Sequence, residues 1–329
     1  MDKLRIVYLG TPDFAVEPLR CLLEKQRACD DCGYEIVGVV TMPDKMINKR
    51  GNQLLMSPVK QFAVAENLPV LQPESLKDET FQAALREWAA DLQIVVAFRM
   101  LPESVWSMPR LGTFNLHASL LPQYRGAAPI NWAIINGDKE TGVTTFFLKH
   151  EIDTGDVIYR DVVAIDENDN AGSLHDKLMI QGGDTVVRTV EAIVKGEASA
   201  TAQTAMYASE SELRPAPKIF RDTCRISWTK NVQQVYDFVR GMSPYPAAWC
   251  ELVGADGKEI ALKVYEVSKE ECCHGKECGS LVTDGKSFVK VAVEGGYVSL
   301  VEVQLAGKKR MPVADLLRGF SIEGMVMKM

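Results

Sequence analysis

The chain has 329 residues, of which 47% are hydrophobic and 25% are charged, with a formal net charge of -7. This length suffices for a large core and favours two domains, and the composition is typical of a soluble globular protein. No apolar run approaches the roughly 20 residues that span a bilayer, and the N-terminus lacks the apolar core of a signal peptide. We therefore expect a cytoplasmic protein without a membrane partner.

The negative charge is confined to the first part of the chain. Residues 1–209 contain 20 Lys and Arg against 28 Asp and Glu, a balance of -8. Residues 210–329 contain 17 against 16, a balance of +1, and the two balances add up to the total of -7. The net charge alone argues weakly against nucleic acid as a partner, but a local basic surface on the second part is compatible with this distribution.

Strand and helix patterns alternate along the first part of the chain. Apolar runs predict strands at Leu4–Leu9, Glu35–Thr41, Leu92–Phe98, Gly112–His117 and Val143–Leu148. Helical spacing and capping residues predict helices at Phe14–Arg27, from Ser57 to near Asn67, at Lys77–Ala90 and at Pro129–Asn136. This alternation indicates an α/β domain with a largely parallel sheet.

The turn after the first predicted strand does not carry a dinucleotide-binding motif. Gly10 is followed by Thr11, Pro12 and Asp13, without the second and third glycines of the G-x-G-x-x-G pattern. Without those glycines the backbone cannot approach a pyrophosphate in the usual way. The sequence therefore disfavours NAD or FAD.

Two connections in the first part invite a functional interpretation. Met42–Ser57 shows no clear period, and Lys45, Lys49 and Arg50 give it a positive tip. Long loops of this kind are commonly functional, so a solvated excursion and a basic finger that touches phosphate are both compatible with it. The loop Arg99-Met100-Leu101-Pro102 follows a core strand, where α/β sheets usually bind ligands, although a simple connection fits equally well.

An amide, an imidazole and a carboxylate are predicted to meet after the next two strands. Asn115 and His117 are two residues apart, so their side chains leave the strand on the same side. Asp153 stands in the turn Asp153-Thr154-Gly155-Asp156, which one strand and its loop can bring alongside. We expect this turn to need Gly155 for its backbone freedom. Such a trio can handle a proton next to a carbonyl group.

His117 is preferred over the other histidines as the functional one. His150 flanks the Asp153 turn and is the nearest rival, whereas His175 lies in a helical stretch and His274 in a cysteine-rich loop. Only His117 has an adjacent neutral donor, Asn115, and a turn that leaves space for a pocket.

The cysteines are expected to be free thiols. The eight are Cys21, Cys29, Cys32, Cys224, Cys250, Cys272, Cys273 and Cys278. In a cytoplasmic chain thiols are the rule, and the adjacent Cys272 and Cys273 do not have the spacing of a zinc knuckle. We predict no metal site.

The second part of the chain resembles a linker followed by a small β domain. The stretch 198–217 is rich in Ala, Ser, Thr and Pro, and Lys230–Arg240 has a helical pattern. Short strand-like runs follow at Ala248–Val253, Ile260–Val267, Gly279–Thr283, Ser287–Val293 and Val298–Gln304, and Val313–Phe320 has the pattern of a closing helix. Runs of this length separated by Gly and Asp are typical of a small antiparallel barrel. Lys308, Lys309 and Arg310 form the densest basic cluster, which suits either a solvated face or phosphate contact.

The central motifs resemble the formyltransferases that use 10-formyltetrahydrofolate. They are Asn115-x-His117-x-Ser119-Leu120-Leu121-Pro122, Arg125-Gly126-Ala127-Ala128-Pro129-Ile130 and Asp153-Thr154-Gly155-Asp156. Further stretches look like those members of the family that formylate the methionine on initiator tRNA: Gly10–Ala15, Pro43-Asp44 followed by Ser57–Lys60, and Arg240–Trp249. The resemblance covers nearly the whole chain.

This resemblance implies a fold, a reaction and a division into domains. The fold would be an open, mostly parallel Rossmann-like catalytic domain at residues 1–197, a linker at 198–217 and an OB-like tRNA-binding barrel at 218–329. The reaction would transfer a formyl group from 10-formyltetrahydrofolate to the α-amine of methionine on initiator tRNA, through a tetrahedral oxyanion. Asn115, His117 and Asp153 would be catalytic: the Asn115 amide and a His117 N–H would stabilise the oxyanion, and Asp153 would orient the imidazole and accept the amine proton.

The resemblance also implies binding residues for both substrates. Ser119, Leu120, Leu121 and Pro122 would line the folate site, and backbone groups of Arg99, Met100, Leu101, Thr154 and Gly155 would hold the pterin. Lys45, Lys49 and Arg50 of the Met42–Ser57 loop would enter the tRNA acceptor stem, and Lys308, Lys309 and Arg310 would contact tRNA. The family's loop is usually richer in Arg, Gly and Lys, so the sequence leaves open which residue here reads the acceptor end.

Three other interpretations share parts of this pattern. A formyltransferase acting on a small amine, such as glycinamide ribonucleotide or an amino-sugar nucleotide, would use the same trio, and so would a hydrolase of 10-formyltetrahydrofolate. An RNA-binding protein with an inactive enzyme domain is disfavoured because all three catalytic residues are present. The basic loop and the barrel favour tRNA, and we expect a monomer that requires no metal.

Overall fold

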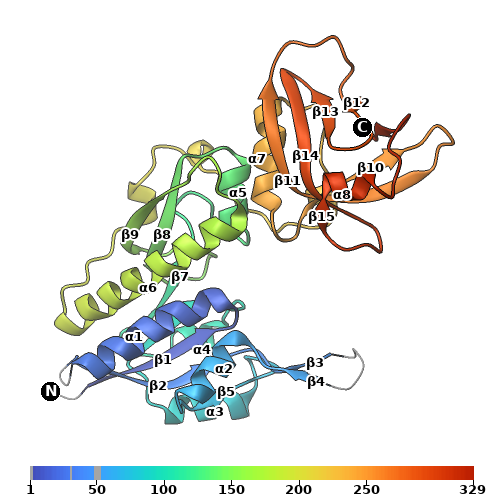
Figure 1. Cartoon of the computed structure of the whole chain (residues 1–329). Helices are drawn as coiled ribbons and strands as arrows, with labels where there is room; N and C mark the ends of the chain where they lie inside the picture. Colours follow the sequence, from blue (N-terminus) through green and yellow to red (C-terminus); the bar gives the residue numbers. More distant parts are fainter. Residues whose placement is uncertain (1–2, 30–31, 48–52) are drawn as a thin grey trace. The chain divides into compact units, whose positions relative to one another are not determined.

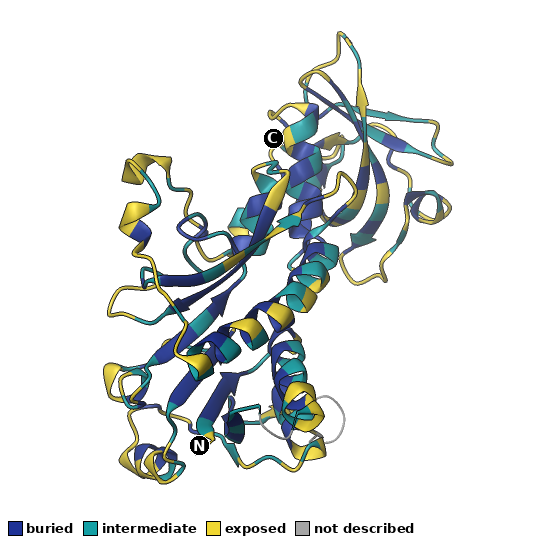
Figure 2. Cartoon of the chain, turned by 90° about the vertical axis from the view of Figure 1, so that its left-hand side faces the viewer, coloured by how far each residue is buried: buried dark blue, intermediate teal, exposed yellow. Residues whose placement is uncertain are grey.

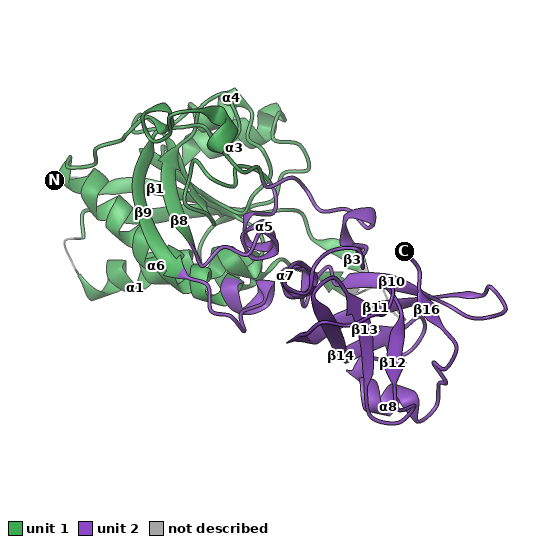
Figure 3. Ribbon diagram, turned by 90° about the horizontal axis from the view of Figure 1, so that it is seen from above, with its two compact units in different colours: residues 1–126, 141–163, 175–215 green, residues 127–140, 164–174, 216–329 purple. Residues whose placement is uncertain are grey.

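The computed structural model describes residues 3–29, 32–47 and 53–329, and the chain forms two compact units (Figure 3). Unit 1 comprises residues 1–126, 141–163 and 175–215, and unit 2 comprises residues 127–140, 164–174 and 216–329. Each unit thus combines segments that are far apart in the sequence. The domain limits expected at residues 197 and 217 stay a prediction.

Unit 1 is built on a seven-stranded sheet with the order β5-β2-β1-β6-β7-β8-β9 (Figure 1). The strands are β1 (Leu4–Gly10), β2 (Tyr34–Val40), β5 (Val70–Leu71), β6 (Leu92–Val96), β7 (Thr113–His117), β8 (Glu140–Phe147) and β9 (Val157–Ala164). β5, β2, β1, β6 and β7 are parallel, and β8 is antiparallel to β7. The predicted, mostly parallel sheet is confirmed.

Six α-helices of the described residues belong to the first part, and those that begin at Pro58 and Glu79 have a capping side chain. They are α1 (Val16–Ala28), α2 (Pro58–Ala65), α3 (Glu79–Glu87), α4 (Glu103–Trp106), α5 (Pro129–Ile135) and α6 (Ala171–Lys195). Ser57 caps α2 by accepting from the Lys60 N–H, as its sequence predicts. On α6, a Cβ on Gly182 would lie 2.7 Å from the Leu116 side chain of β7. This glycine lets the helix approach the strand that carries the candidate site.

The Met42–Ser57 stretch, which the sequence indicated to be a long loop without a clear period, contains two short strands. It forms an antiparallel hairpin from β3 (Lys45–Ile47) and β4 (Gln53–Leu55) (Figure 1). Met46 and Leu54 on one face and Leu55 on the other are more than half exposed, so neither face is buried and the alternation that identifies a strand is missing. The base of the hairpin is held by Asp44, which pairs with Lys60 and lies 2.8 Å from the Gln72 Nε2. The Lys60 bond lowers the pKa of Asp44.

Unit 2 contains a small antiparallel barrel. Its strands are β10 (Ala248–Val253), β11 (Glu259–Glu271), β12 (Leu281–Thr283), β13 (Val289–Val293), β14 (Gly296–Leu305), β15 (Met311–Pro312) and β16 (Val326–Met327). The order is β12-β13-β14-β11-β10-β16, with β15 beside β14. A bridge between Ser280 and Val326 joins the two ends, so the barrel is nearly closed, as predicted.

The barrel core is filled from alternate strand positions and from helix α7 (Val232–Met242). Along β10, Ala248, Cys250 and Leu252 are buried and the residues between them are half-buried. Figure 2 shows buried residues in dark blue along the strands of the chain. A capping box at Asn231 starts α7, whose apolar face enters the same core, and α8 (Val313–Leu317) closes one side. Within the described residues, none of the helices combines the length and apolar character that a bilayer crossing requires.

Candidate functional site

His117 ends β7 and is held by a backbone carbonyl. Its side chain is buried, and its Nε2 lies 2.8 Å from the Tyr124 carbonyl oxygen. A carbonyl oxygen only accepts, so Nε2 carries a proton in this arrangement. The other ring nitrogen, Nδ1, lies 4.0 Å from the Asp153 Oδ2. Nδ1 is therefore the nitrogen that can exchange a proton with a substrate.

Asp153 is fixed opposite His117 by the chain that turns after β7. Its Oδ2 accepts a hydrogen bond of 3.0 Å from the Gly126 N–H. Asp153 has a φ of 55° and Tyr124 a φ of 61°, so both residues occupy the left-handed region. Side chains seldom adopt it, at a cost of about 1–3 kcal/mol each, and such residues cluster at functional sites. Both of these residues place a polar group beside the imidazole of His117.

Asn115 supplies an amide on the same side of β7. It stands opposite Val95 of β6 and Phe146 of β8, and its side chain is half-buried. Within the described ranges, its carboxamide has no hydrogen-bond partner. A half-buried amide without a partner can donate to a bound carbonyl oxygen.

The turn from Ser119 to Tyr124 is held by two hydroxyl groups. The Ser119 Oγ donates to the Gln123 carbonyl over 2.6 Å, and the Thr144 Oγ1 donates to the Ser119 carbonyl over 2.6 Å. The Thr144 hydroxyl also accepts from the Leu121 N–H at 3.1 Å. Of the four predicted folate-lining residues, Ser119, Leu121 and Pro122 are buried and Leu120 is half-buried. Their contact with folate stays a prediction.

Gln203 is the residue of this site that the sequence interpretation missed. It is 1% exposed, and its Nε2 donates to the carbonyl oxygens of Asp153 and Gly155 at 2.9 and 2.8 Å. Its Oε1 accepts from the Arg125 guanidinium at 3.0 and 2.7 Å. One amide thus ties the Asp153 turn to the Arg125 segment. No local pattern signals this role, because Gln203 lies in the stretch predicted to be a linker.

Gly155 is required at its turn for a reason other than the one predicted. Its φ lies outside the left-handed region, so backbone freedom is not what the position needs. A Cβ on Gly155 would lie 1.6 Å from the Phe147 carbonyl oxygen. The sequence-based explanation is therefore wrong, and the glycine permits close packing of the turn on β8. The positive φ belongs instead to Asp153. Next to it, the Thr154 hydroxyl donates to the Glu151 carbonyl at 3.0 Å.

The loop after β6 is anchored by its arginine. The Arg99 Nη1 donates to the Glu74 carbonyl at 2.7 Å, its Nη2 donates to the Pro73 carbonyl, and partial burial lowers the pKa of the Arg99 guanidinium. Met100 is exposed and Leu101 is buried. Both terminal nitrogens of Arg99 are therefore engaged, and the contact of this loop with the pterin stays a prediction that involves its backbone.

Four of the six predicted tRNA-binding residues are described by the structure. Lys45 is exposed on β3, whereas Lys49 and Arg50 lie outside the described residues. Lys308 and Lys309 are exposed in the loop between β14 and β15. Arg310 pairs with Glu302 and lies 4.3 Å from the centre of the Tyr265 ring. Lys308 and Lys309 are therefore better placed than Arg310 to receive a phosphate.

The rival histidine lies apart from these groups. His150 is strongly exposed, with its Nε2 3.4 Å from Glu103 and its ring edge-on to Trp106. Among the residues that the structure describes, no three His, Cys, Asp or Glu side chains gather as a metal site requires.

Comparisons with known proteins identify both parts of the chain. Residues 4–190 match the formyl transferase family, and residues 218–321 match the formyl transferase C-terminal domain. A methionyl-tRNA formyltransferase of Bacteroides fragilis is 60% identical, over 98% of this chain and 96% of its own. One of Flavobacterium johnsoniae is 48% identical, over 98% of each chain.

Solved structures share the fold at low sequence identity. HypX from Aquifex aeolicus in complex with tetrahydrofolic acid is 20% identical with a TM-score of 0.62, over 96% of this chain and 47% of HypX. The chain thus spans about half of HypX. The sugar 3N-formyl transferase WlaRD is 16% identical with a TM-score of 0.61, over 94% of this chain and 100% of WlaRD. These two similarities concern the fold alone.

Proposed function

We propose an activity on the premise that this chain belongs to the methionyl-tRNA formyltransferase family. It transfers the formyl group of 10-formyltetrahydrofolate to the α-amine of methionine esterified to initiator tRNA, for translation initiation. The observation that carries the proposal is the arrangement of Asn115, His117 and Asp153. The Asn115 amide is half-buried on the same strand as His117, and the His117 Nδ1 lies 4.0 Å from a carboxylate that the Gly126 N–H holds in place.

The first step forms a carbon–nitrogen bond. The α-amine attacks the formyl carbon, and the formyl oxygen becomes an oxyanion. The Asn115 carboxamide donates a hydrogen bond to that oxygen, where the negative charge develops. A preorganised donor of this kind lowers the barrier because it costs no reorganisation during the reaction.

The second step moves one proton and breaks one bond. In place of the roles that the resemblance implies, the His117 Nδ1 accepts the proton that the attacking amine loses, because the Nε2–H is held by the Tyr124 carbonyl and does not donate to the oxyanion. Asp153, 4.0 Å from Nδ1, stabilises the resulting imidazolium. The bond between the formyl carbon and the folate nitrogen then breaks, and His117 returns the proton to that nitrogen. Tetrahydrofolate leaves, and the protonation state of the enzyme is restored.

The binding of both substrates follows the same proposal. The folate lies beside Ser119–Pro122, Arg99–Leu101, Thr154 and Gly155. The tRNA contacts Lys45, Lys49 and Arg50 of the Met42–Ser57 stretch and Lys308, Lys309 and Arg310 of the second part of the chain. We propose a monomer that works in the cytoplasm.

The test is formyl transfer from 10-formyltetrahydrofolate to three acceptors, namely methionine-charged initiator tRNA, free methionine and glycinamide ribonucleotide. We expect transfer to the charged tRNA alone. Transfer to a small amine would overturn the tRNA assignment and favour a small-amine formyltransferase. Release of formate without any acceptor would identify a hydrolase.

A further inference from the structure

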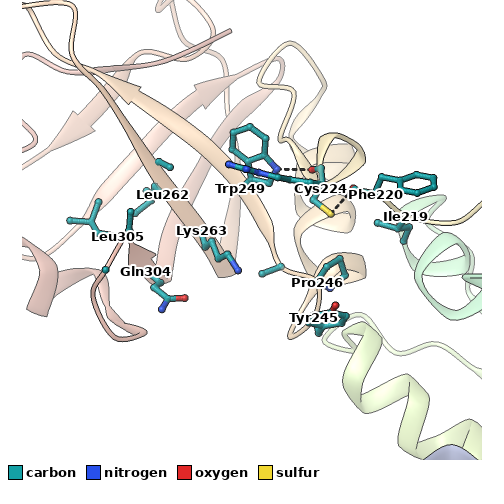
Figure 4. Close-up of a pocket in the computed structure, with 15 residues that line it drawn as sticks. Ile219, Phe220, Cys224, Tyr245, Pro246, Trp249, Leu262, Lys263, Gln304 and Leu305 are labelled. Carbon is teal, nitrogen blue, oxygen red and sulfur yellow. Dashed lines mark hydrogen bonds between the residues drawn. The ribbon is translucent and has the colours of Figure 1, made fainter. Parts of the chain in front are cut away.

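Unit 2 contains a hollow that the proposed reaction does not use. Its volume is about 600 Å³. The segment 219–224 and the turn 245–247 form one side, and β10, β11 and the end of β14 form the other (Figure 4). The lining of the hollow shares Cys224, Leu262 and Leu305 with the barrel core that α7 fills.

Three aromatic side chains line this hollow. Phe220 is 63% exposed and Tyr245 is 83% exposed, and these are the only aromatic residues among the large exposed hydrophobic side chains of the described residues. Trp249 is half-buried, and its Nε1 donates to the Arg221 carbonyl at 2.8 Å, which fixes the indole (Figure 4). Exposed aromatic rings around one hollow indicate a binding surface.

The charge of the hollow has a single sign. Among the residues that the structure describes, Arg221 and Lys263 are the charged residues of its lining, and none of them contributes a carboxylate. The Arg221 guanidinium lies 5.4 Å from the centre of the Trp249 ring, and the Lys218 ammonium lies 5.6 Å from that of Phe220. The lining ends at Gly307, directly before Lys308 and Lys309. The aromatic hollow therefore continues into the basic loop.

We propose that this hollow binds an unpaired nucleotide of the RNA substrate, with the base stacked on the aromatic rings and its phosphate against Arg221 and Lys263. Aromatic platforms with flanking cations are how proteins hold single-stranded nucleic acid, because every base offers a stacking face. An apolar peptide would leave both cations without a counter-charge. The inference rests on the proposed function, since the RNA is the tRNA that carries methionine.

The test compares two variants with a matched control. Phe220→Ala and Tyr245→Ala remove exposed rings, so the barrel core is untouched. Phe288→Ala removes a ring of the same barrel that also lies beside a lysine, with the Lys290 ammonium 5.8 Å from its centre, but outside the hollow. We measure the Kd of the full-length protein for initiator tRNA and the single-turnover rate at saturating charged tRNA.

We expect roughly 5- to 150-fold weaker tRNA binding for each hollow variant, from the usual strength of base stacking. The single-turnover rate of each hollow variant at saturating charged tRNA should match that of the wild type. Phe288→Ala should match the wild type in both Kd and rate. Ultraviolet cross-linking of wild type to tRNA should attach a nucleotide to a peptide that contains Phe220, Tyr245 or Trp249. If both variants bind tRNA with normal affinity while the wild type formylates tRNA, the proposal that the hollow binds a nucleotide is refuted and the proposed function stands. A wild type that formylates small amines alone would refute both.

Discussion

At the scale of single residues, the proposed reaction depends on two side chains. The Asn115 amide donates to the formyl oxygen, and the His117 imidazole accepts a proton from the attacking amine. Replacing Asn115 with Ala removes the oxyanion donor, and replacing His117 with Ala removes the proton carrier. We expect each change to lower the single-turnover rate of formyl transfer by about 10²–10³-fold, the usual effect of losing one such group.

The matched control for this experiment is His150→Ala, because His150 is an exposed histidine of the same unit. Its rate should equal that of the wild type. A normal rate for either Asn115→Ala or His117→Ala would show that the assigned residue takes no part in the chemistry.

Gln203 is a positioning residue, because its amide ties the Asp153 turn to the Arg125 segment. In Gln203→Glu the carboxylate can still bond to Arg125, but it loses both donations and faces the Asp153 and Gly155 carbonyls with like charge. We expect the Asp153 carboxylate to shift and kcat to fall by roughly 10²-fold, as for misplaced catalytic groups, with KM for tRNA unchanged. Methionine is apolar and similar in size to glutamine, so kcat should fall less in Gln203→Met than in Gln203→Glu.

Steady-state kinetics of formyl transfer measure this split between kcat and KM. Gln61→Glu is the control, since the Gln61 side chain is exposed and donates to the Met56 carbonyl of its own segment. Equal loss of stability and of kcat in both Gln203 variants would indicate a purely structural role instead.

At the scale of elements, the connection from β8 to β9 depends on the space left by one glycine. In Gly155→Ala the new Cβ would meet the Phe147 carbonyl oxygen at 1.6 Å, so the turn and β8 must separate. Overpacking of this kind costs about 1–3 kcal/mol of folding free energy. Because Asp153 lies in the same turn, transfer activity should fall as well.

Thermal unfolding and single-turnover transfer measure these two effects. Gly275→Ala serves as the control, because nothing lies within 4 Å of its added Cβ and its φ is outside the left-handed region. A Gly155→Ala variant with wild-type Tm and activity would contradict the close packing of the turn on β8.

The elements also show where sequence interpretation succeeds. Apolar runs with clear periods predicted β1, β2, β7 and β10 to within a residue or two, because burial on a defined face imposes the period. The β3–β4 hairpin escaped prediction because its apolar side chains are exposed and carry no such signal. Gln203 escaped because its hydrogen bonds reach residues about 50 positions away, which no local pattern records.

The limit of local sequence patterns also explains why the role of Gly155 in the Asp153 turn was interpreted wrongly. The sequence indicates that a turn position requires glycine, but it does not show whether the requirement comes from backbone freedom or from a close approach between chain segments. The family motifs identified Asn115, His117 and Asp153 as candidates. The tautomer of His117 required the position of the Tyr124 carbonyl, which only the fold supplies.

At the scale of the whole molecule, an acidic chain has to bind a polyanion. The balance of -8 over residues 1–209 repels tRNA, whereas residues 210–329 carry +1. Binding must therefore rely on local clusters, and the affinity should fall steeply with salt as phosphate contacts release counterions. Each Lys or Arg that contacts a phosphate adds about 0.7–0.9 to the slope of log Kd against log salt concentration.

We therefore expect the double variant Lys308→Ala with Lys309→Ala to lower this slope by about 1.4–1.8. Arg310→Ala should change it less, because Glu302 already pairs with that guanidinium. Phe220→Ala should weaken binding equally at low and high salt, because stacking releases no counterion.

Fluorescence titration of labelled initiator tRNA over a salt series measures the salt dependence of Kd for these three variants. Lys195→Ala, which replaces an exposed lysine at the end of α6, is the control. An unchanged slope in the double lysine variant would remove the β14–β15 loop from the tRNA-binding surface. A lowered slope there, together with a salt-independent loss in Phe220→Ala, would mean that unit 2 holds the tRNA backbone by charge and one nucleotide by stacking.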